Sequence, residues 1–126
     1  MFAAKRAYPT IPAADMTRAK RWYEEKLGLK PTSESEYGAK YELPGGAGFT
    51  LYPTEHAGKA PNTLMCFSSN EVESDVADLK NRGVKFEDYD LPGMKMVNSI
   101  ATAGSMKGAW FRDSEGNILA ISSDPG

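Results

Sequence analysis

Apolar residues recur at helical spacing in two stretches of the chain, and each stretch ends at a glycine. The first runs from Met16 to Leu27 and ends at Gly28, with Asp15 placed to cap its first turn. The second runs roughly from 71 to 82 and ends at Gly83. The stretches start about 56 residues apart, so the sequence predicts two helices in a unit that occurs twice.

Runs that alternate between apolar and polar residues lie around these helices and predict strands. Pro44–Gly46 and Asp113–Asn117 have the composition of turns, 55–62 is the expected linker, and Leu91–Ser105 is expected to be irregular. We expect about eight strands and two helices in two βαβββ units. One strand precedes each helix, and the others are Tyr37–Leu43, Gly48–Tyr52, Val84–Tyr89, Met106–Arg112 and Ile118–Ser122.

Composition excludes several classes of protein. The chain has 126 residues, which suits one domain. It carries 15 basic and 17 acidic residues, and a net charge of -2 argues against a nucleic-acid partner. No apolar run approaches the roughly 18 residues that span a membrane, and the N-terminus lacks the apolar core of a secretion signal. A cytoplasmic location is therefore expected.

Metal-binding and redox residues are scarce. The chain has one cysteine, Cys66, and one histidine, His56. These counts exclude an internal disulfide, a redox cysteine pair and a zinc site built from cysteine and histidine. We expect Cys66 to be a small buried hydrophobe and His56 to be exposed in the linker loop.

Several short motifs, in this order, make the chain resemble the vicinal oxygen chelate superfamily, also called the glyoxalase/bleomycin resistance/dioxygenase family. The resemblance implies an α+β fold in a single domain, residues 1–126, with modules at about 1–56 and 57–126. The two βαβββ modules would form a curved mixed sheet around a ligand cleft. A homodimer with clefts at or near the interface is also implied. The motifs are Ile11–Asp15, Ala19-x-x-Trp22-Tyr23-x-x-x-Leu27-Gly28, Phe67, Leu79, Gly83-Val84-x-Phe86 and Phe111-Arg112-Asp113-x-x-Gly116-Asn117.

Enzymes of this family hold a divalent metal through His or Gln on the first strand of each module and Glu on the last. The resemblance places these positions at Tyr8, Thr50, Leu64 and Ala120. None is His, Gln, Glu or Asp, and a shift of one residue restores no ligand set. We therefore predict no metal, no cofactor and no catalytic residue at the family's positions.

Strand alternation predicts which side chains face the cleft. The expected lining mixes apolar groups with hydroxyls, and flexible methionines and a tryptophan from the second module add to it. Such a cleft suits a sizeable, partly aromatic organic ligand, whereas a small anionic metabolite would call for a placed Arg or Lys. The predicted ligand-binding residues are Tyr8, Thr10, Thr50, Tyr52, Leu64, Cys66, Met94, Met96, Trp110 and Ala120.

Three functions are compatible with these features. The first is a metal-independent binding protein that confers antibiotic resistance by sequestering a large aromatic natural product. The second is an enzyme of the same superfamily, a lyase, epimerase or dioxygenase, with a metal held in another way or with Tyr8 in acid–base catalysis. The third is a structural or regulatory module without a small ligand. The sequence favours the first, because binding needs a shaped cavity and no catalytic group.

Overall fold

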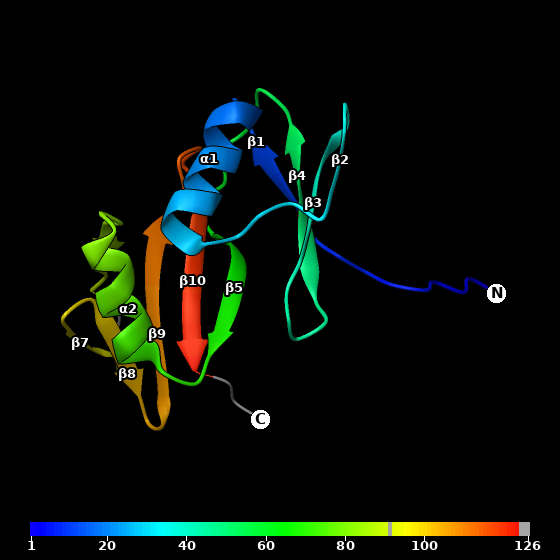
Figure 1. Cartoon of the computed structure of the whole chain (residues 1–126). Coiled ribbons are helices and arrows are strands. Elements are labelled where there is room, and N and C mark those ends of the chain that lie inside the picture. Colours follow the sequence, from blue (N-terminus) through cyan, green and yellow to red (C-terminus); the bar gives the residue numbers. More distant parts are fainter. Residues whose placement is uncertain (91, 124–126) are drawn as a thin grey trace.

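A computed structural model of the chain describes residues 1–90 and 92–123, which contain two helices and ten strands (Figure 1). The predicted two-module α+β fold is confirmed. Neither helix of this described part is long and apolar enough to cross a membrane. The first module comprises β1 (Thr10–Ala13), α1 (Met16–Leu27), β2 (Ser33–Ser35), β3 (Gly38–Glu42) and β4 (Gly48–Pro53). The second comprises β5 (Thr63–Ser69), α2 (Val72–Asn81), β6 (Phe86–Glu87), β7 (Lys95–Val97), β8 (Ile100–Ala103), β9 (Met106–Arg112) and β10 (Ile118–Ser123).

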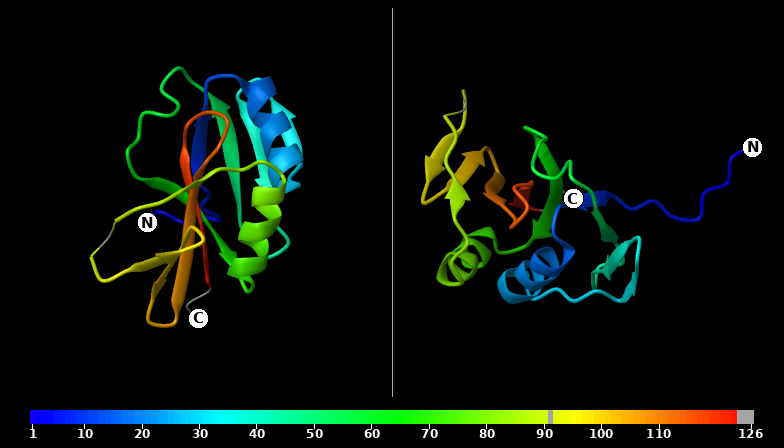
Figure 2. Two further views of the ribbon diagram at one scale, coloured as in Figure 1. Left: turned by 90° about the vertical axis from the view of Figure 1, so that its left-hand side faces the viewer. Right: turned by 90° about the horizontal axis from the view of Figure 1, so that it is seen from above.

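The strands form two open sheets, where the sequence predicts one curved sheet. Sheet A has the order β1-β4-β3-β2, and sheet B has the order β5-β10-β9-β8-β7 with β6 on β9. In both sheets the first strand of the module runs parallel to its last strand. The two units that repeat in the sequence therefore share the same arrangement of first and last strands. Figure 2 shows α1 and α2 side by side on the same side of the two sheets.

Local signals place the helix ends as predicted. The Asp15 side chain accepts a hydrogen bond from the Arg18 N–H at 3.0 Å, which caps α1. Gly28 adopts the left-handed conformation, with φ of 70°, and its N–H bonds back to the last turn. The helix α2 lies within the predicted 71–82 range.

The prediction of an irregular stretch at 91–105 is wrong, because β7 and β8 form a hairpin there. Asn98 and Ser99 both have positive φ, at 52° and 69°, as a tight type I′ turn requires. The sequence gives little sign of this hairpin, because its turn contains polar residues and no glycine, and because the two strands beside it are short. Leu91, the start of the predicted stretch, lies outside the described residues.

Strand alternation sends apolar side chains toward the helices and builds the core. Tyr41 and Phe49 stack at 4.7 Å between ring centroids, and Tyr23 of α1 packs against both. Trp22, on the same helix, stacks on Phe111 of β9 at 6.2 Å. The helix α1 therefore packs on its own sheet and also reaches sheet B, so the two modules share one core.

A buried polar joint holds the turn between β9 and β10 against the first module. Asp113 Oδ2 accepts hydrogen bonds from the Tyr23 hydroxyl at 2.7 Å and from Asn117 Nδ2 at 2.9 Å. Asp113 Oδ1 accepts from the N–H groups of Glu115 and Asn117. Asn117 Nδ2 also donates to the Pro12 carbonyl at 2.8 Å. Burial raises the pKa of Asp113, and these donated hydrogen bonds oppose the rise.

Glu115 adds an ion pair to this joint. Its carboxylate accepts from Arg18 Nε at 2.8 Å and Nη2 at 3.0 Å, and from the Asp15 N–H at 2.9 Å. Burial alone would raise its pKa, but the hydrogen bonds from Arg18, Asp15 and Ser114 outweigh burial and lower the pKa to about 2. Asp15 therefore caps α1 with its side chain and binds the second module with its backbone.

The linker between the modules is held against the same turn. The Gly58 N–H donates to Asn117 Oδ1 at 3.3 Å. A Cβ on Gly58 would lie 2.6 Å from the Glu115 carbonyl oxygen, and the residue has a φ of 76°. Only glycine fits this approach and this backbone conformation.

Two buried tyrosines allow a matched test of the joint. We expect Tyr23→Phe to lower the free energy of unfolding by about 1.5–3 kcal/mol, because it removes a hydrogen bond to a buried carboxylate. The Tyr41 hydroxyl is buried with no hydrogen-bond partner among the described residues. Tyr41→Phe should therefore be neutral or stabilising. Urea unfolding of both variants measures the difference, and equal losses of stability would contradict this account.

The Glu115 carboxyl predicts a specific loss of stability in acid. Its folded-state pKa of about 2 lies below its ordinary value of 4.5, so its contribution is complete above about pH 4.5. That contribution is lost progressively as the pH falls toward 2. Glu115→Gln should therefore flatten the fall in unfolding free energy over this range. Glu25→Gln, at an exposed position of α1, is the control and should leave the slope unchanged.

Candidate functional site

The face of sheet A that points away from the helices carries a row of polar side chains. Thr10, Thr50, Lys40 and Ser33 are successive cross-strand partners on β1, β4, β3 and β2. Directly paired residues point to the same side of a sheet, so the four side chains lie next to one another. The ammonium group of Lys40 lies over the Tyr8 ring, 5.0 Å from its centroid.

Ser33, Lys40 and Thr50 of this row line a shallow hollow of about 240 Å³, together with residues that include Tyr8, Glu34 and Tyr37. The Lys40 ammonium and the hydroxyls of Tyr8, Thr10, Ser33 and Thr50 form no hydrogen bond with any other described residue. Their donors are therefore available to a ligand.

The corresponding face of sheet B combines aromatic and apolar side chains with the carboxylate of Glu87, which is paired with Arg112. Cys66, Ala120 and Trp110 form a cross-strand row over β5, β10 and β9, and Glu87 of β6 extends it. The Tyr89 ring packs edge-on against Trp110, with centroids 5.3 Å apart at 75°. Trp110, Tyr89, Thr63 and Ile118 line a second hollow of about 230 Å³.

The structure divides the ten predicted ligand-binding residues between these two faces. Four belong to sheet A or the segment before it: Tyr8, Thr10, Thr50 and Tyr52. Five belong to sheet B: Leu64, Cys66, Met96, Trp110 and Ala120. Met94 lies in the loop before β7. The two hollows share no lining residue, so within one chain they are separate.

Two predictions about single residues have different outcomes. Cys66 is exposed, so the prediction of a buried hydrophobe is wrong. The reason is that β5 is an edge strand and that the Cys66 side chain lies on the face turned away from the helices. Its Sγ lies 3.1 Å from Ser122 Oγ. His56 is exposed in the linker, as predicted, within 3.9 Å of a Glu55 oxygen.

Lys40 is the site residue that sequence reasoning missed. The expectation of a cleft without a placed Arg or Lys is wrong for sheet A, because Lys40 lines its hollow. The signal was present, because buried Ala39 and Tyr41 flank Lys40 and alternation must turn it to the opposite face.

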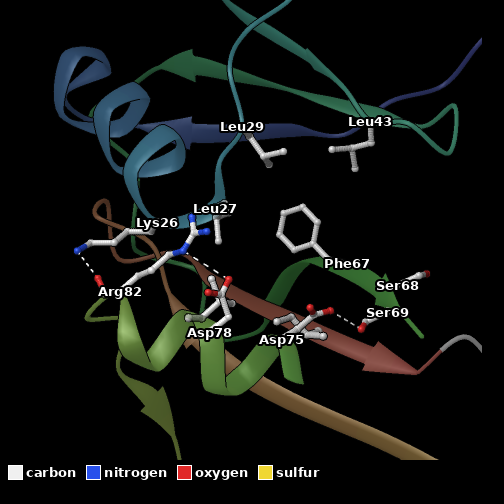
Figure 3. A pocket seen from close by; sticks show the side chains of 12 residues that line it. Lys26, Leu27, Leu29, Leu43, Phe67, Ser68, Ser69, Asp75, Asp78 and Arg82 are labelled. Atoms are coloured by element: carbon white, nitrogen blue, oxygen red, sulfur yellow. Dashed lines mark hydrogen bonds and ion pairs between the residues drawn. The ribbon is translucent and has the colours of Figure 1, made fainter. Parts of the chain in front are cut away.

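A third hollow, of about 200 Å³, opens between the modules on the helix side (Figure 3). Most of its polar side chains already have partners: Ser69 Oγ donates to Asp75 at 2.5 Å, and Arg82 pairs with Asp78 at 3.4 Å. The ammonium of Lys26 donates to the Arg82 carbonyl at 2.5 Å. Half-buried apolar side chains, including Leu29 and Phe67, form the rest of its wall. This hollow is a seam between the modules rather than a polar binding site.

A family model matches most of the chain. Residues 5–121 match the model described as "Glyoxalase/Bleomycin resistance protein/Dioxygenase superfamily". The chain belongs to this superfamily. No curated protein matches it.

Solved structures of the superfamily share the fold at low sequence identity. UcmS2 is 20% identical with a TM-score of 0.71, over 96% of this chain and 98% of UcmS2. A glyoxalase/bleomycin resistance protein from Catenulispora acidiphila is 19% identical with a TM-score of 0.69, over 97% and 100%. The fosfomycin resistance protein FosX from Listeria monocytogenes, complexed with Mn(II) and sulfate, is 10% identical with a TM-score of 0.70, over 97% and 91%.

The residues at the superfamily's metal positions do not fit a metal. Tyr8 and Thr50 lie together in the hollow on sheet A, whereas Leu64 and Ala120 belong to sheet B. Leu64 and Ala120 carry no donor atom, and Ala120 is only 5% exposed in the floor of its face. The residues that the structure describes contain no group of three His, Cys, Asp or Glu side chains that could replace them.

Proposed function

We propose that this protein binds a large aromatic natural product in the cytoplasm and confers resistance to it by sequestration, without a metal and without turnover. The observation that carries the proposal is the chemistry of the two sheet faces. One presents hydroxyls and a lysine with free donors, and the other presents Trp110 and Tyr89. Stacking on aromatic rings and a few polar contacts are what an organic ligand of this kind requires.

Superfamily membership supports a ligand-binding role, and the relatives of the same fold include a fosfomycin resistance protein. The chemistry of that relative does not transfer as such, because the positions of a superfamily metal are filled here by side chains such as Leu64 and Ala120. Sequestration needs affinity and abundance rather than a reacting group.

We further propose that the working form is a homodimer in which sheet A of one chain lies opposite sheet B of the other. The separation of the two hollows within one chain supports this proposal. A symmetric pairing would assemble two equivalent clefts, each with a polar and an aromatic wall.

Metal independence predicts that purified protein holds no stoichiometric zinc, nickel, iron or manganese. We also expect that adding any of these ions, or removing them with a chelator, leaves the unfolding temperature unchanged. Elemental analysis and thermal unfolding measure both. A stoichiometric metal that is lost on changing Tyr8 or Thr50 would overturn the proposal in favour of an enzyme.

Ligand binding can be followed with tryptophan fluorescence, because Trp22 and Trp110 are the only tryptophans and lie on opposite sides of the sheets. In the Trp22→Phe variant, Trp110 is the only tryptophan. Aromatic antibiotics should quench its fluorescence, and the quenching should saturate as the ligand concentration rises. In Trp110→Phe, Trp22 is the only reporter, and its emission should barely respond. Light scattering gives the number of chains in the particle, and the saturation point of the titration gives the number of ligands bound per chain.

Truncating aromatic side chains of the cleft tests the same site through the affinity for the ligand. Trp110→Ala and Tyr52→Ala should each weaken binding roughly tenfold or more, since they remove aromatic surface, while the unfolding temperature shows whether the fold is intact. Mass spectrometry should recover every ligand unaltered. Full affinity in both variants, or product formation, would contradict sequestration at this site.

A further inference from the structure

The ligand that suits this protein carries an acidic group, and Lys40 selects it. We propose this as a specificity rule for sheet A: the ligand is an aromatic carboxylate, phenolate or similar anion whose charged end lies on Lys40. The inference rests on the function proposed above, because it names the chemical class of ligand for the same cleft.

The first support is the lack of a protein partner for the Lys40 ammonium. It forms no ion pair with any described acidic residue, and its one noted contact is the face of the Tyr8 ring. An ammonium has three donors, and a ring face satisfies none of them as a hydrogen bond does. The strongest partner that a ligand can offer is a carboxylate or other oxyanion.

The second support is the set of neighbours on both sides of Lys40. Thr50 and Ser33 are its direct cross-strand partners, so a hydroxyl adjoins it on each flank. These hydroxyls, like that of Tyr8, are not engaged with other described residues. An ammonium with adjacent hydroxyl donors can give several hydrogen bonds to one anion.

The third support is the position of the nearby carboxylates. Glu34 belongs to the alternate face of β2, and its Oε1 is held by Lys20 of α1 at 2.6 Å. Glu42 lies two residues from Lys40 on the same face of β3, but the two form no ion pair. Glu34 nevertheless lines the same hollow, so a bound anion would meet Lys40 as its positive partner, with Glu34, which Lys20 neutralises, and Glu42 as acidic neighbours.

An acid and its neutral isostere test this rule. We would titrate 2-naphthoate and 2-naphthamide into the Trp22→Phe protein at low ionic strength. We expect the acid to bind roughly tenfold more tightly and the preference to shrink as salt is added. Lys40→Met should remove the preference and leave the affinity for the amide unchanged. Glu42→Gln should increase the preference.

Matched controls separate a local effect from a general change of charge. Lys30→Met removes one positive charge from an exposed pair with Glu24 and should leave the preference intact. Unfolding temperatures of Lys40→Met and Lys30→Met confirm that both fold. Equal affinities for acid and amide in the parent protein, or an unchanged preference in Lys40→Met, would overturn the inference.

Benzoate and benzamide at millimolar concentration distinguish this inference from the proposed function. Benzoate alone should shift the backbone amide resonances of Lys40, Thr50 and Ser33, whether or not large aromatic antibiotics bind. If benzoate produces these shifts and no antibiotic binds, the anion site stands and sequestration falls. If antibiotics bind while benzoate shifts none of the three amides, sequestration stands and the role of Lys40 falls.

Discussion

The buried carboxylate of Asp113 holds the two modules in register. A carboxylate out of water is costly unless donors surround it, and here the donors come from both modules: the Tyr23 hydroxyl of α1 and the groups of its own turn. Asn117 extends the joint to the Pro12 carbonyl and to the linker at Gly58. Because Asn117 bonds the carboxylate as well as β1 and the linker, these elements, α1 and the β9–β10 turn come together in one geometry.

This joint decides which surfaces remain for function. It fixes α1 over the seam, where Trp22 stacks on Phe111 and closes the shared core on the helix side. The polar groups of that side are paired, as the Ser69–Asp75 and Arg82–Asp78 contacts show. The opposite faces of the sheets receive no helix, and the side chains that alternation sends there remain available.

Local patterns predicted what depends on local chemistry. Asp15 and Gly28 mark the ends of α1, and the sequence places both correctly. The sequence marks Asp113–Asn117 as a turn but not as a joint, because the Tyr23–Asp113 bond spans 90 residues and leaves no periodic trace. The β7–β8 hairpin was missed because its strands are short and its turn uses Asn98 and Ser99 without glycine. Lys40 could have been found, since the buried neighbours Ala39 and Tyr41 determine its direction.

The surroundings of the polar groups support the proposed binding role. A general acid or base needs a partner that orients it and sets its protonation state. Tyr8, the hydroxyl nearest a superfamily metal position, is 46% exposed and has only the Lys40 ammonium over its ring. Water satisfies such donors in the free protein at little cost, and a ligand with matching acceptors replaces that water. Free donors beside a lysine on one face and the edge-on pair of Trp110 and Tyr89 on the other therefore support the proposed role in recognition.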